Sequence, residues 1–202
     1  MQDPRYKNDK LDHTSLAGLK NDYARRIASN LVDVDEKNLF DFVELLNSVG
    51  TSGRKIFLAG NGGSASIAEH AACDLTKGTF FENKFRISAV SLSSNLSLIT
   101  AISNDFSYEE VYSFQLETMA KDGDALLLIS SSGNSLNIVK AADKAKTLGV
   151  RTVGLTGFDG GILRERVDIS FHVNSNHYGL VEDTHMSLIH MAIDIFQQKY
   201  LA

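Results

Sequence analysis

The sequence has one cysteine, one proline and no tryptophan among its 202 residues. A single cysteine, Cys73, cannot form a disulfide within the chain. One proline and 22% charged residues argue against a proline-rich linker or a disordered protein. The first thirty residues lack an apolar signal core, and no apolar run approaches the ~20 residues that a membrane span needs. These absences predict a soluble, cytoplasmic protein.

The chain also lacks an excess of positive charge. It has 20 basic and 25 acidic residues, for a formal net charge of -5. No net positive field is available to attract nucleic acid or an anionic membrane, so neither is expected as a partner. The content of hydrophobic residues is 43%, and the length is about one domain on a prior of roughly 150 residues each. We therefore expect a single domain over residues 1–202 with one well-filled core.

The spacing of apolar residues changes near residue 50. Residues 11–49 have apolar positions at helical spacing, which predicts an N-terminal helical region over residues 1–50 with two helices. A long closing helix is predicted for residues 179–202. Between them lie five short apolar runs, at residues 55–59, 87–92, 125–129, 152–155 and 169–173. Runs that are apolar on both faces suit parallel strands covered on each side, so the expected fold is a three-layer α/β/α sandwich with a five-stranded parallel sheet.

Two predicted strands end in loops that suit an anion. The first strand continues into Gly60-Asn61-Gly62-Gly63-Ser64, after which helical spacing resumes. Glycines let the backbone approach a ligand closely, and the free N–H groups of the following helix favour a phosphate or a polar sugar. The third strand ends in Ser130-Ser131-Ser132-Gly133-Asn134-Ser135, again before a predicted helix. Hydroxyl groups at a helix N-terminus form a neutral phosphate cup.

Each loop alone has a simpler interpretation as a strand-to-helix turn, with Ser64 as the N-cap in the first and surplus capping residues in the second. Both loops lie at carboxyl ends of predicted strands, where open α/β sheets bind their ligands, and together they favour a binding site. Neither loop matches the Walker motif or the dinucleotide fingerprint. A small phosphorylated ligand is therefore favoured over ATP or NAD.

Two predicted helices carry possible metal ligands. His70 and Asp74 are four residues apart on the helix after the first loop, while Glu182 and His190 are eight apart on the last helix. Each pair shares a helix face, and two imidazoles with two carboxylates are a set of ligands that suits zinc. Either pair alone is more typical of a hydrogen bond at the helix surface or of a solvated face.

The remaining candidates are weaker. His185 lies near the same stripe of the last helix, but its spacing makes it a second choice as a ligand. Cys73 adjoins a predicted ligand, yet we expect it to be an interior free cysteine. The other histidines have no partner at a suitable spacing and are expected to be structural or exposed: His13, His172 and His177.

Taken together, these motifs resemble the sugar isomerase (SIS) domain of the phosphoheptose isomerases, over about residues 20–200. The resemblance rests on both loops and both predicted ligand pairs. Three further segments contribute to it: Asn104-Asp105, Leu155-Thr156-Gly157 and Asp159-Gly160-Gly161. It implies a homotetramer with sites at subunit interfaces. It also implies interconversion of sedoheptulose 7-phosphate and D-glycero-D-manno-heptose 7-phosphate, on the way to nucleotide-activated heptose.

The resemblance also implies roles for individual residues. The phosphate would be held by Ser130, Ser131, Ser132 and Ser135. The sugar would be lined by Asn61, Gly62, Gly63, Ser64, Asn104 and Asp105. Zinc binding and proton transfer would fall to His70, Asp74, Glu182 and His190.

The chain departs from the family pattern at two of these positions. The pattern usually has Glu where this chain has Asp74, and Gln where it has Glu182. The interconversion moves a proton between neighbouring carbons through an enediol, so it needs a base, an acid and a positive centre. We assign the base to Asp74 and the second proton to His190, with Glu182 touching both metal and substrate. The division of labour between the two carboxylates is open.

Other functions remain open at this level. A non-catalytic SIS protein would keep both loops, as a phosphosugar sensor or a replication-initiator-binding scaffold, but such proteins tend to lose the acid, base and metal positions. Retention of His70 and His190 favours the enzyme. A sugar-responsive transcription factor is disfavoured because the N-terminal region has no basic helix-turn-helix unit. An isomerase for a different sugar phosphate is a further alternative.

Overall fold

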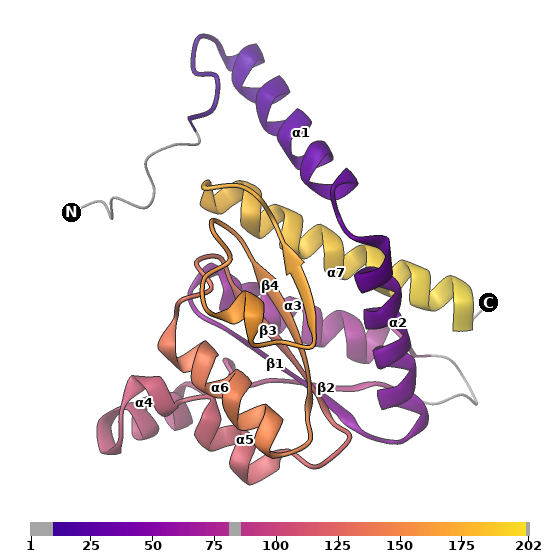
Figure 1. The fold of residues 1–202 in the computed structure, drawn as a ribbon, viewed down its shortest axis with the longest axis vertical. Helices are drawn as coiled ribbons and strands as arrows, with labels where there is room; N and C mark the ends of the chain where they lie inside the picture. Colours follow the sequence, from indigo (N-terminus) through magenta and orange to yellow (C-terminus); the bar gives the residue numbers. More distant parts are fainter. Residues whose placement is uncertain (1–9, 81–85, 201–202) are drawn as a thin grey trace.

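The five predicted strands form one parallel sheet in the computed structural model, which describes residues 10–80 and 86–200 (Figure 1). Each strand agrees with its predicted run to within about two residues at either end, because the pattern follows burial. The strands are β1 (Lys55–Gly60), β2 (Ser88–Ser91), β3 (Ala125–Ser130), β4 (Arg151–Thr156) and β5 (Ile169–His172).

The order of strands across the sheet is β2-β1-β3-β4-β5. In the register, Ile56 of β1 pairs with Ala125 of β3 and with Ala89 of β2. The chain therefore reverses its direction of winding between β1 and β3. In open parallel sheets, a reversal of this kind leaves a crevice at the carboxyl ends of the two strands, where ligands bind. The two predicted ligand loops begin at these strand ends.

Successive residues of a strand enter opposite cores, as the pleat of a β-strand requires. In β3, Leu127 and Ile129 belong to one hydrophobic cluster, whereas Leu126 and Leu128 belong to the other. All four side chains are fully buried. The sheet thus has a core on each face, which confirms the predicted three-layer sandwich.

The helices divide between these two faces. One core is covered by α2 (Glu36–Thr51), α3 (Gly63–Gly78) and α7 (Tyr178–Tyr200). The other is covered by α4 (Leu96–Asp105), α5 (Ser113–Met119) and α6 (Leu136–Thr147). Short 3-10 turns lie at Tyr108–Glu110 (η2) and Leu163–Glu165 (η3). Among the described residues, no helix combines the length and apolar character needed to cross a bilayer.

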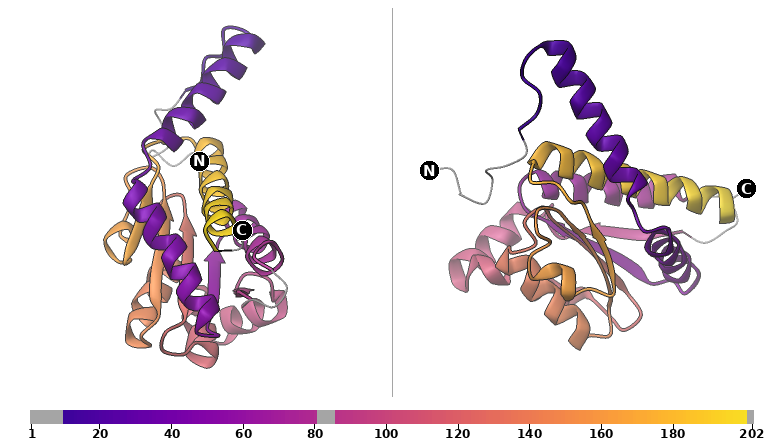
Figure 2. Two further views of the ribbon diagram at one scale, coloured as in Figure 1. Left: turned by 90° about the vertical axis from the view of Figure 1, so that its right-hand side faces the viewer. Right: turned by 45° about the horizontal axis from the view of Figure 1, so that its top comes forward.

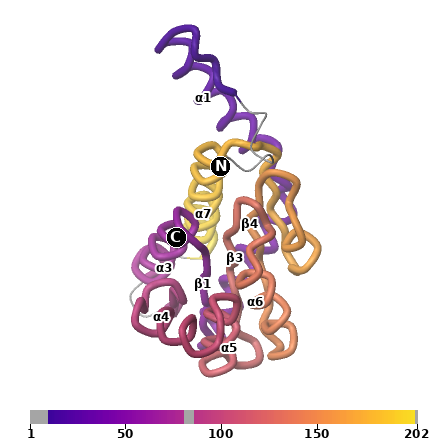
Figure 3. The backbone as a smooth tube through the Cα atoms, turned by 90° about the vertical axis from the view of Figure 1, so that its left-hand side faces the viewer, coloured from indigo at the N-terminus to yellow at the C-terminus, as the bar shows by residue number. Residues whose placement is uncertain are grey.

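The helices α3 and α7 lie side by side and run in the same direction (Figure 3). Near its start, α3 approaches α7 at Gly63, beside Glu182. Near its end, the carbonyl of Gly78 accepts a hydrogen bond from Gln197 at 2.7 Å. Residues at matching heights on the two helices are therefore neighbours, which determines how their polar side chains meet.

The first helix, α1 (Leu16–Val32), stands away from the sandwich and contacts it mainly along α7 (Figures 1 and 2). Ser15 caps it by accepting a hydrogen bond from the amide of Gly18 at 2.9 Å. Its residues are largely solvent-accessible, and Leu16 and Val32 are 74% and 83% exposed. Exposed apolar side chains of this kind are available for contact with a neighbouring subunit.

One histidine of α7 lies in the core. The side chain of His185 is completely buried, and its Nε2 atom lies 3.1 Å from the carbonyl oxygen of Thr156. Its Nδ1 atom has no hydrogen-bond partner among the described residues. Burial lowers the pKa of this imidazole to about 4. The side chain is therefore a neutral core residue, and its position does not support the second-choice role as a metal ligand.

Because of the buried His185, we expect the folded protein to lose stability in acid. Because the pKa of His185 is lower in the folded than in the unfolded chain, its contribution is complete above pH 6.5 and declines as the pH falls toward 4. We expect this loss to reach about 3 kcal/mol at most. In His185→Gln, which keeps a donor for Thr156, the decline should be smaller. Urea unfolding of both proteins between pH 4 and 7 measures it, and identical slopes would contradict the prediction.

Candidate active site

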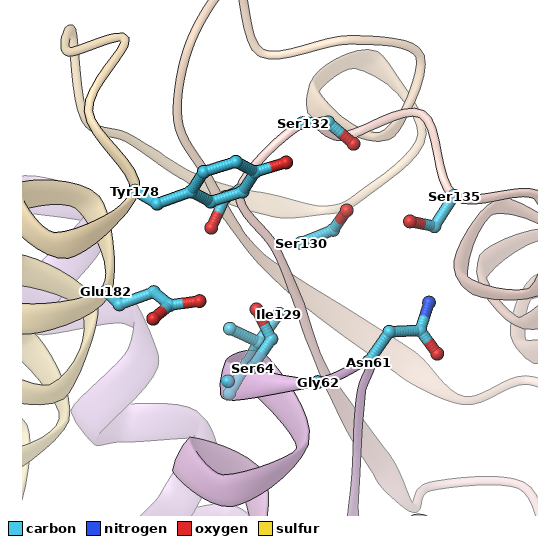
Figure 4. A pocket seen from close by; sticks show the side chains of 11 residues that line it. Asn61, Gly62, Ser64, Ile129, Ser130, Ser132, Ser135, Tyr178 and Glu182 are labelled. Atoms are coloured by element: carbon cyan, nitrogen blue, oxygen red, sulfur yellow. The ribbon is translucent and has the colours of Figure 1, made fainter. Parts of the chain in front are cut away.

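A pocket of about 280 Å³ opens at the carboxyl ends of β1 and β3, where the sheet reverses its winding (Figure 4). Three segments form its walls: the loop after β1, the loop after β3 and the first turns of α7. The pocket is lined by Asn61, Gly62, Gly63, Ser64, Ile129, Ser130, Ser131, Ser132, Ser135, Tyr178 and Glu182. Nine of these eleven residues are among the predicted substrate contacts.

The loop after β1 is a tight connection that only glycine can form. Gly62 is the N-cap of α3 and has a φ of +56°, a conformation that L side chains rarely adopt. Ser64 therefore lies inside the first turn rather than at the cap, and the cap position makes no side-chain hydrogen bond. The turn interpretation with Ser64 as N-cap is wrong, because the glycine occupies that position. The N-terminus of α3 remains open toward the pocket.

The serine hydroxyl groups of the loop after β3 differ in whether they have a hydrogen-bond partner within the chain. Ser130 is buried and accepts a hydrogen bond from the amide of Gly133 at 3.1 Å. The hydroxyl of Ser132 accepts one from the amide of Asn134 at 3.3 Å. By contrast, the buried hydroxyl of Ser131 has no partner among the described residues, and Ser135, although at the N-cap of α6, makes no capping bond. These unused groups favour a ligand over a surplus of capping residues.

The serine loop is held from behind by the segment after β4. The amide of Leu163 donates to the carbonyl of Gly133 at 2.9 Å, and the amide of Ile162 donates to the side chain of Asn134 at 3.1 Å. Gly157 donates its amide to the carbonyl of Ser131 at 2.9 Å. These bonds fix the shape of the loop before any ligand arrives, which reduces the entropy lost on binding.

The serine loop predicts how binding depends on its hydroxyl groups. We expect the double variant Ser132→Ala with Ser135→Ala to bind phosphorylated ligands at least about a hundredfold more weakly, because charge-assisted hydrogen bonds contribute about 1.5–3 kcal/mol each. Inhibition by inorganic phosphate and the KM for a sugar phosphate measure this change. The control is Ser52→Ala, which removes an exposed hydroxyl at the end of α2. Equal affinity in the double variant and wild type would exclude the phosphate cup.

A carboxylate faces the serine loop across the pocket. Glu182, in the first turns of α7, points into the cavity opposite Asn61 (Figure 4). Its carboxylate lies against the start of α3, so that a Cβ atom at Gly63 would lie 2.6 Å from Oε2. Burial, assisted by the charge of Asp183, raises the pKa of this carboxyl above its usual range. The pocket therefore has one wall of phosphate-binding type and one acidic wall.

Three of the four predicted metal ligands form a cluster on the exposed side of α3 and α7. Oδ2 of Asp74 lies 3.1 Å from Nε2 of His70 and 3.3 Å from Nε2 of His190. One ligand atom from each residue can be chosen so that all lie within 4.8 Å of one another. The two imidazole rings are 5.4 Å apart between centroids. Sequence spacing predicted each pair separately, and the packing of the two helices brings them together.

The composition of the cluster suits zinc, and two of its three ligand separations can be compared with those of a zinc site. Ligand atoms at about 2.0–2.2 Å from a tetrahedral zinc ion are about 3.4 Å from one another. The separations of 3.1 and 3.3 Å between the carboxylate oxygen and the two imidazole nitrogens are close to this value. All three side chains are partly exposed, at 31–52%, so an ion has access. Two nitrogens and one oxygen leave a coordination position for a substrate.

Glu182, the fourth predicted ligand, lies apart from this cluster. It precedes His190 by eight residues, which corresponds to about 12 Å along a helix. The same face of α7 thus carries both residues, but Glu182 lies at the pocket and His190 lies beside His70. Its role as a ligand to the same ion remains a prediction.

Two other predicted contacts lie elsewhere. Asn104 and Asp105 are at the end of α4, are exposed and hydrogen-bond to each other at 2.9 Å. They are not among the residues that line the pocket, and their contact with the sugar remains a prediction.

Cys73 corrects an expectation. It is exposed on α3 rather than interior, because its position on the helix faces away from the core that Ala71 and Leu75 enter.

Two pocket residues were not predicted from the sequence. Tyr178, at the start of α7, overhangs the cavity and packs edge-on against Phe158, with ring centroids 5.0 Å apart. Ile129 contributes the floor at the end of β3. An aromatic residue beside the predicted start of the last helix was a usable signal for Tyr178. Ile129 had none, since it reads as an ordinary strand residue.

Comparison with known proteins gives a consistent result. The sequence pattern of the SIS domain matches residues 21–157. A probable phosphoheptose isomerase of Thermoplasma acidophilum is 35% identical over 178 residues, covering 88% of this chain and 97% of that protein. The phosphoheptose isomerase of Geobacter sulfurreducens is 36% identical over 184 residues, covering 91% and 90%. The structure of a phosphoheptose isomerase from Francisella tularensis superposes with a TM-score of 0.83 at 26% identity, covering 92% of this chain and all of that one.

Proposed function

This chain belongs to the phosphoheptose isomerase family of SIS-domain proteins, and from that membership we propose that it interconverts sedoheptulose 7-phosphate and D-glycero-D-manno-heptose 7-phosphate. The product would supply the synthesis of nucleotide-activated heptose. The observation that carries the proposal is the combination of a serine-lined pocket with a cluster of two histidines and an aspartate further along α3 and α7. A module that only binds phosphosugars needs the pocket but not the cluster.

The proposed reaction assigns separate tasks to the two parts of the site. The serine loop and the N-terminus of α3 bind the phosphate and the near end of the sugar. Asp74 removes a proton from the carbon next to the carbonyl while His190 protonates the carbonyl oxygen, which gives the enediol. The reverse transfers at the other carbon and the other oxygen then give the isomeric sugar. Asn61 and Glu182, on opposite walls of the pocket, orient the hydroxyl groups between these ends.

Zinc is part of this proposal. The donor set fits the ion, and His70, Asp74 and His190 would hold it. When bound, it would polarise the sugar carbonyl and stabilise negative charge on the enediolate. A residue cannot serve fully as ligand and proton carrier at once, so we assign metal binding primarily to His70, while Asp74 and His190 divide between metal binding and proton transfer.

The distance along α3 from the pocket to the histidine cluster is comparable with the length of a seven-carbon sugar phosphate. His70 is seven residues after Gly63 on α3, about 10 Å along the helix axis. With C–C bonds of about 1.5 Å, an extended seven-carbon sugar with its phosphate reaches about 10 Å. The distance from Gly63, at one wall of the pocket, to the histidine cluster is therefore of the same order as the length of such a substrate.

We also propose that the protein is a homotetramer with its active sites at subunit interfaces. The exposed α1 supports this assembly, because its apolar residues Leu16 and Val32 are uncovered in one chain. So does the exposed position of the histidine cluster, which a neighbouring subunit would shield from bulk water. Analytical ultracentrifugation tests the assembly. An active monomer at micromolar concentration would contradict it.

The decisive experiment is turnover of a panel of ketose phosphates by the purified protein, with and without zinc after chelation. We expect sedoheptulose 7-phosphate to be the best substrate, with activity lost on chelation and restored by zinc. Preference for a shorter sugar would assign a different isomerase function. Binding of sugar phosphates without turnover of any of them would make the protein a phosphosugar-binding module.

A further inference from the structure

A reciprocal pair of amide side chains joins the two loops of the pocket. Nδ2 of Asn61 donates to Oδ1 of Asn137, and Nδ2 of Asn137 donates to Oδ1 of Asn61, both at 2.9 Å. Asn61 follows β1, whereas Asn137 lies in the first turn of α6, directly after the serine loop. Asn137 is only 2% exposed and is not part of the pocket lining. Any effect of its side chain on a ligand must therefore pass through other residues.

One backbone amide fixes the orientation of both side chains. The N–H of Ile138 is shared between Oδ1 of Asn137 and the carbonyl of Ser135, each at 3.0 Å. A backbone N–H can only donate, so the atom that it meets must be the oxygen of Asn137 and not its nitrogen. The nitrogen of Asn137 then faces Asn61, where it requires an acceptor. The orientation of the Asn61 amide follows from this chain of contacts.

A tyrosine contacts the same amide from the other side. The hydroxyl of Tyr108 donates to Oδ1 of Asn61 at 2.9 Å. The oxygen of Asn61 thus accepts from both Asn137 and Tyr108 on the side away from the cavity. Its nitrogen carries two hydrogens, of which one bonds to Asn137. In Figure 4 the nitrogen is turned toward the serine loop and the oxygen away from it, so that the second N–H is presented to the pocket.

We propose that Asn137 is a positioning residue that makes Asn61 a hydrogen-bond donor toward the bound ligand. The acceptor is an oxygen atom of the phosphosugar, which every part of such a ligand provides. This inference rests on the proposed function for the identity of the ligand, but the orientation of the amide rests only on the contacts above. It adds a buried residue to the determinants of substrate affinity.

A double-mutant cycle tests this mechanism. In Asn137→Asp, the carboxylate still accepts from Ile138, but its second oxygen opposes Oδ1 of Asn61, and the amide loses its single preferred orientation. We expect the KM for sedoheptulose 7-phosphate to rise about fivefold to tenfold, as for the loss of one hydrogen bond, with a smaller change in kcat. In the background of Asn61→Ala, the same substitution should change the KM less than twofold. If Asn137→Asp does not fold, Asn137→Ala completes the same cycle.

Two results would overturn the proposal: an unchanged KM in Asn137→Asp, or an equal increase in both backgrounds, since the latter would show that the new charge acts on the serine loop directly. Asn38→Asp is the matched control. It removes a partly buried amide donor on α2, which bonds to the carbonyl of Ser170 at 3.0 Å and lies outside the pocket lining. It should lower the melting temperature and leave the KM unchanged.

A second measurement does not depend on turnover. In ¹⁵N-labelled protein, hydrogen exchange of the Asn61 side-chain amide should be slower for one proton in wild type than in Asn137→Ala, which removes the acceptor of that proton. Equal exchange rates would contradict the positioning role even in an active enzyme. Failure of wild-type protein to convert sedoheptulose 7-phosphate, with slowed exchange intact, would instead contradict the proposed function alone.

Discussion

Replacement of Asp74 by Asn should reduce turnover of sedoheptulose 7-phosphate by 10²- to 10⁴-fold while changing the KM little. Asn has the same size and keeps one oxygen near His70 and His190, but its amide cannot take up the proton that a carboxylate base removes from carbon. General-base catalysis typically contributes a factor of this size. Equal decreases in kcat and kcat/KM would indicate that the lost interaction is made only in the transition state.

The same variant separates proton transfer from metal binding. The introduced amide would still offer an oxygen to an ion, and both imidazoles remain, so zinc affinity measured by calorimetry should decrease much less than turnover. The control is Asp143→Asn. It makes the same change on α6, where Asp143 forms a surface ion pair with Arg166. It should leave both quantities unchanged, since exposed ion pairs contribute about 0–1 kcal/mol. Near-normal turnover in Asp74→Asn would show that another residue is the base.

The buried parts of this fold were accessible to sequence reasoning because burial leaves a direct pattern. The run at residues 125–129 is apolar at every position, and β3 is indeed buried on both faces. The order of the strands was a different matter. It depends on which strands pair across large sequence separations, as Ile56 does with Ala125, and no local pattern records that choice.

In the candidate site, too, local patterns could be predicted from the sequence, whereas contacts that depend on packing could not. Helix periodicity placed Glu182 and His190 on one face correctly, but a shared face does not show how far apart two residues lie along the helix. Glu182 lines the pocket, whereas His190 belongs to the histidine cluster. The buried amide pair had no signal at all. Asn137 reads as an ordinary polar residue in a helix, and Tyr108 lies in a segment whose position depends on the packing of α4 and α5.

Replacement of Gly133 by Ala should abolish measurable phosphate binding and destabilise the protein. Gly133 has a φ of +63°, which costs a non-glycine residue on the order of 1–3 kcal/mol. A Cβ atom there would also overlap the carbonyl of Gly160, whose carbon would lie only 2.6 Å away. Because the obstacle is backbone, the serine loop must move away from the segment that holds it, and the bond from Leu163 to the Gly133 carbonyl is lost.

A second glycine separates strain from collision. Gly53, in the turn between α2 and β1, has nearly the same φ of +65°, but no atom of the described residues lies within 4 Å of the position that its Cβ would take. Gly53→Ala should therefore show the backbone cost alone, with unchanged inhibition by inorganic phosphate and an unchanged KM. Urea unfolding gives the free energy for each variant, and the excess loss in Gly133→Ala measures the displacement of the loop. If both variants lost the same stability and both bound phosphate normally, the contact between the serine loop and Gly160 would not be what shapes the phosphate site.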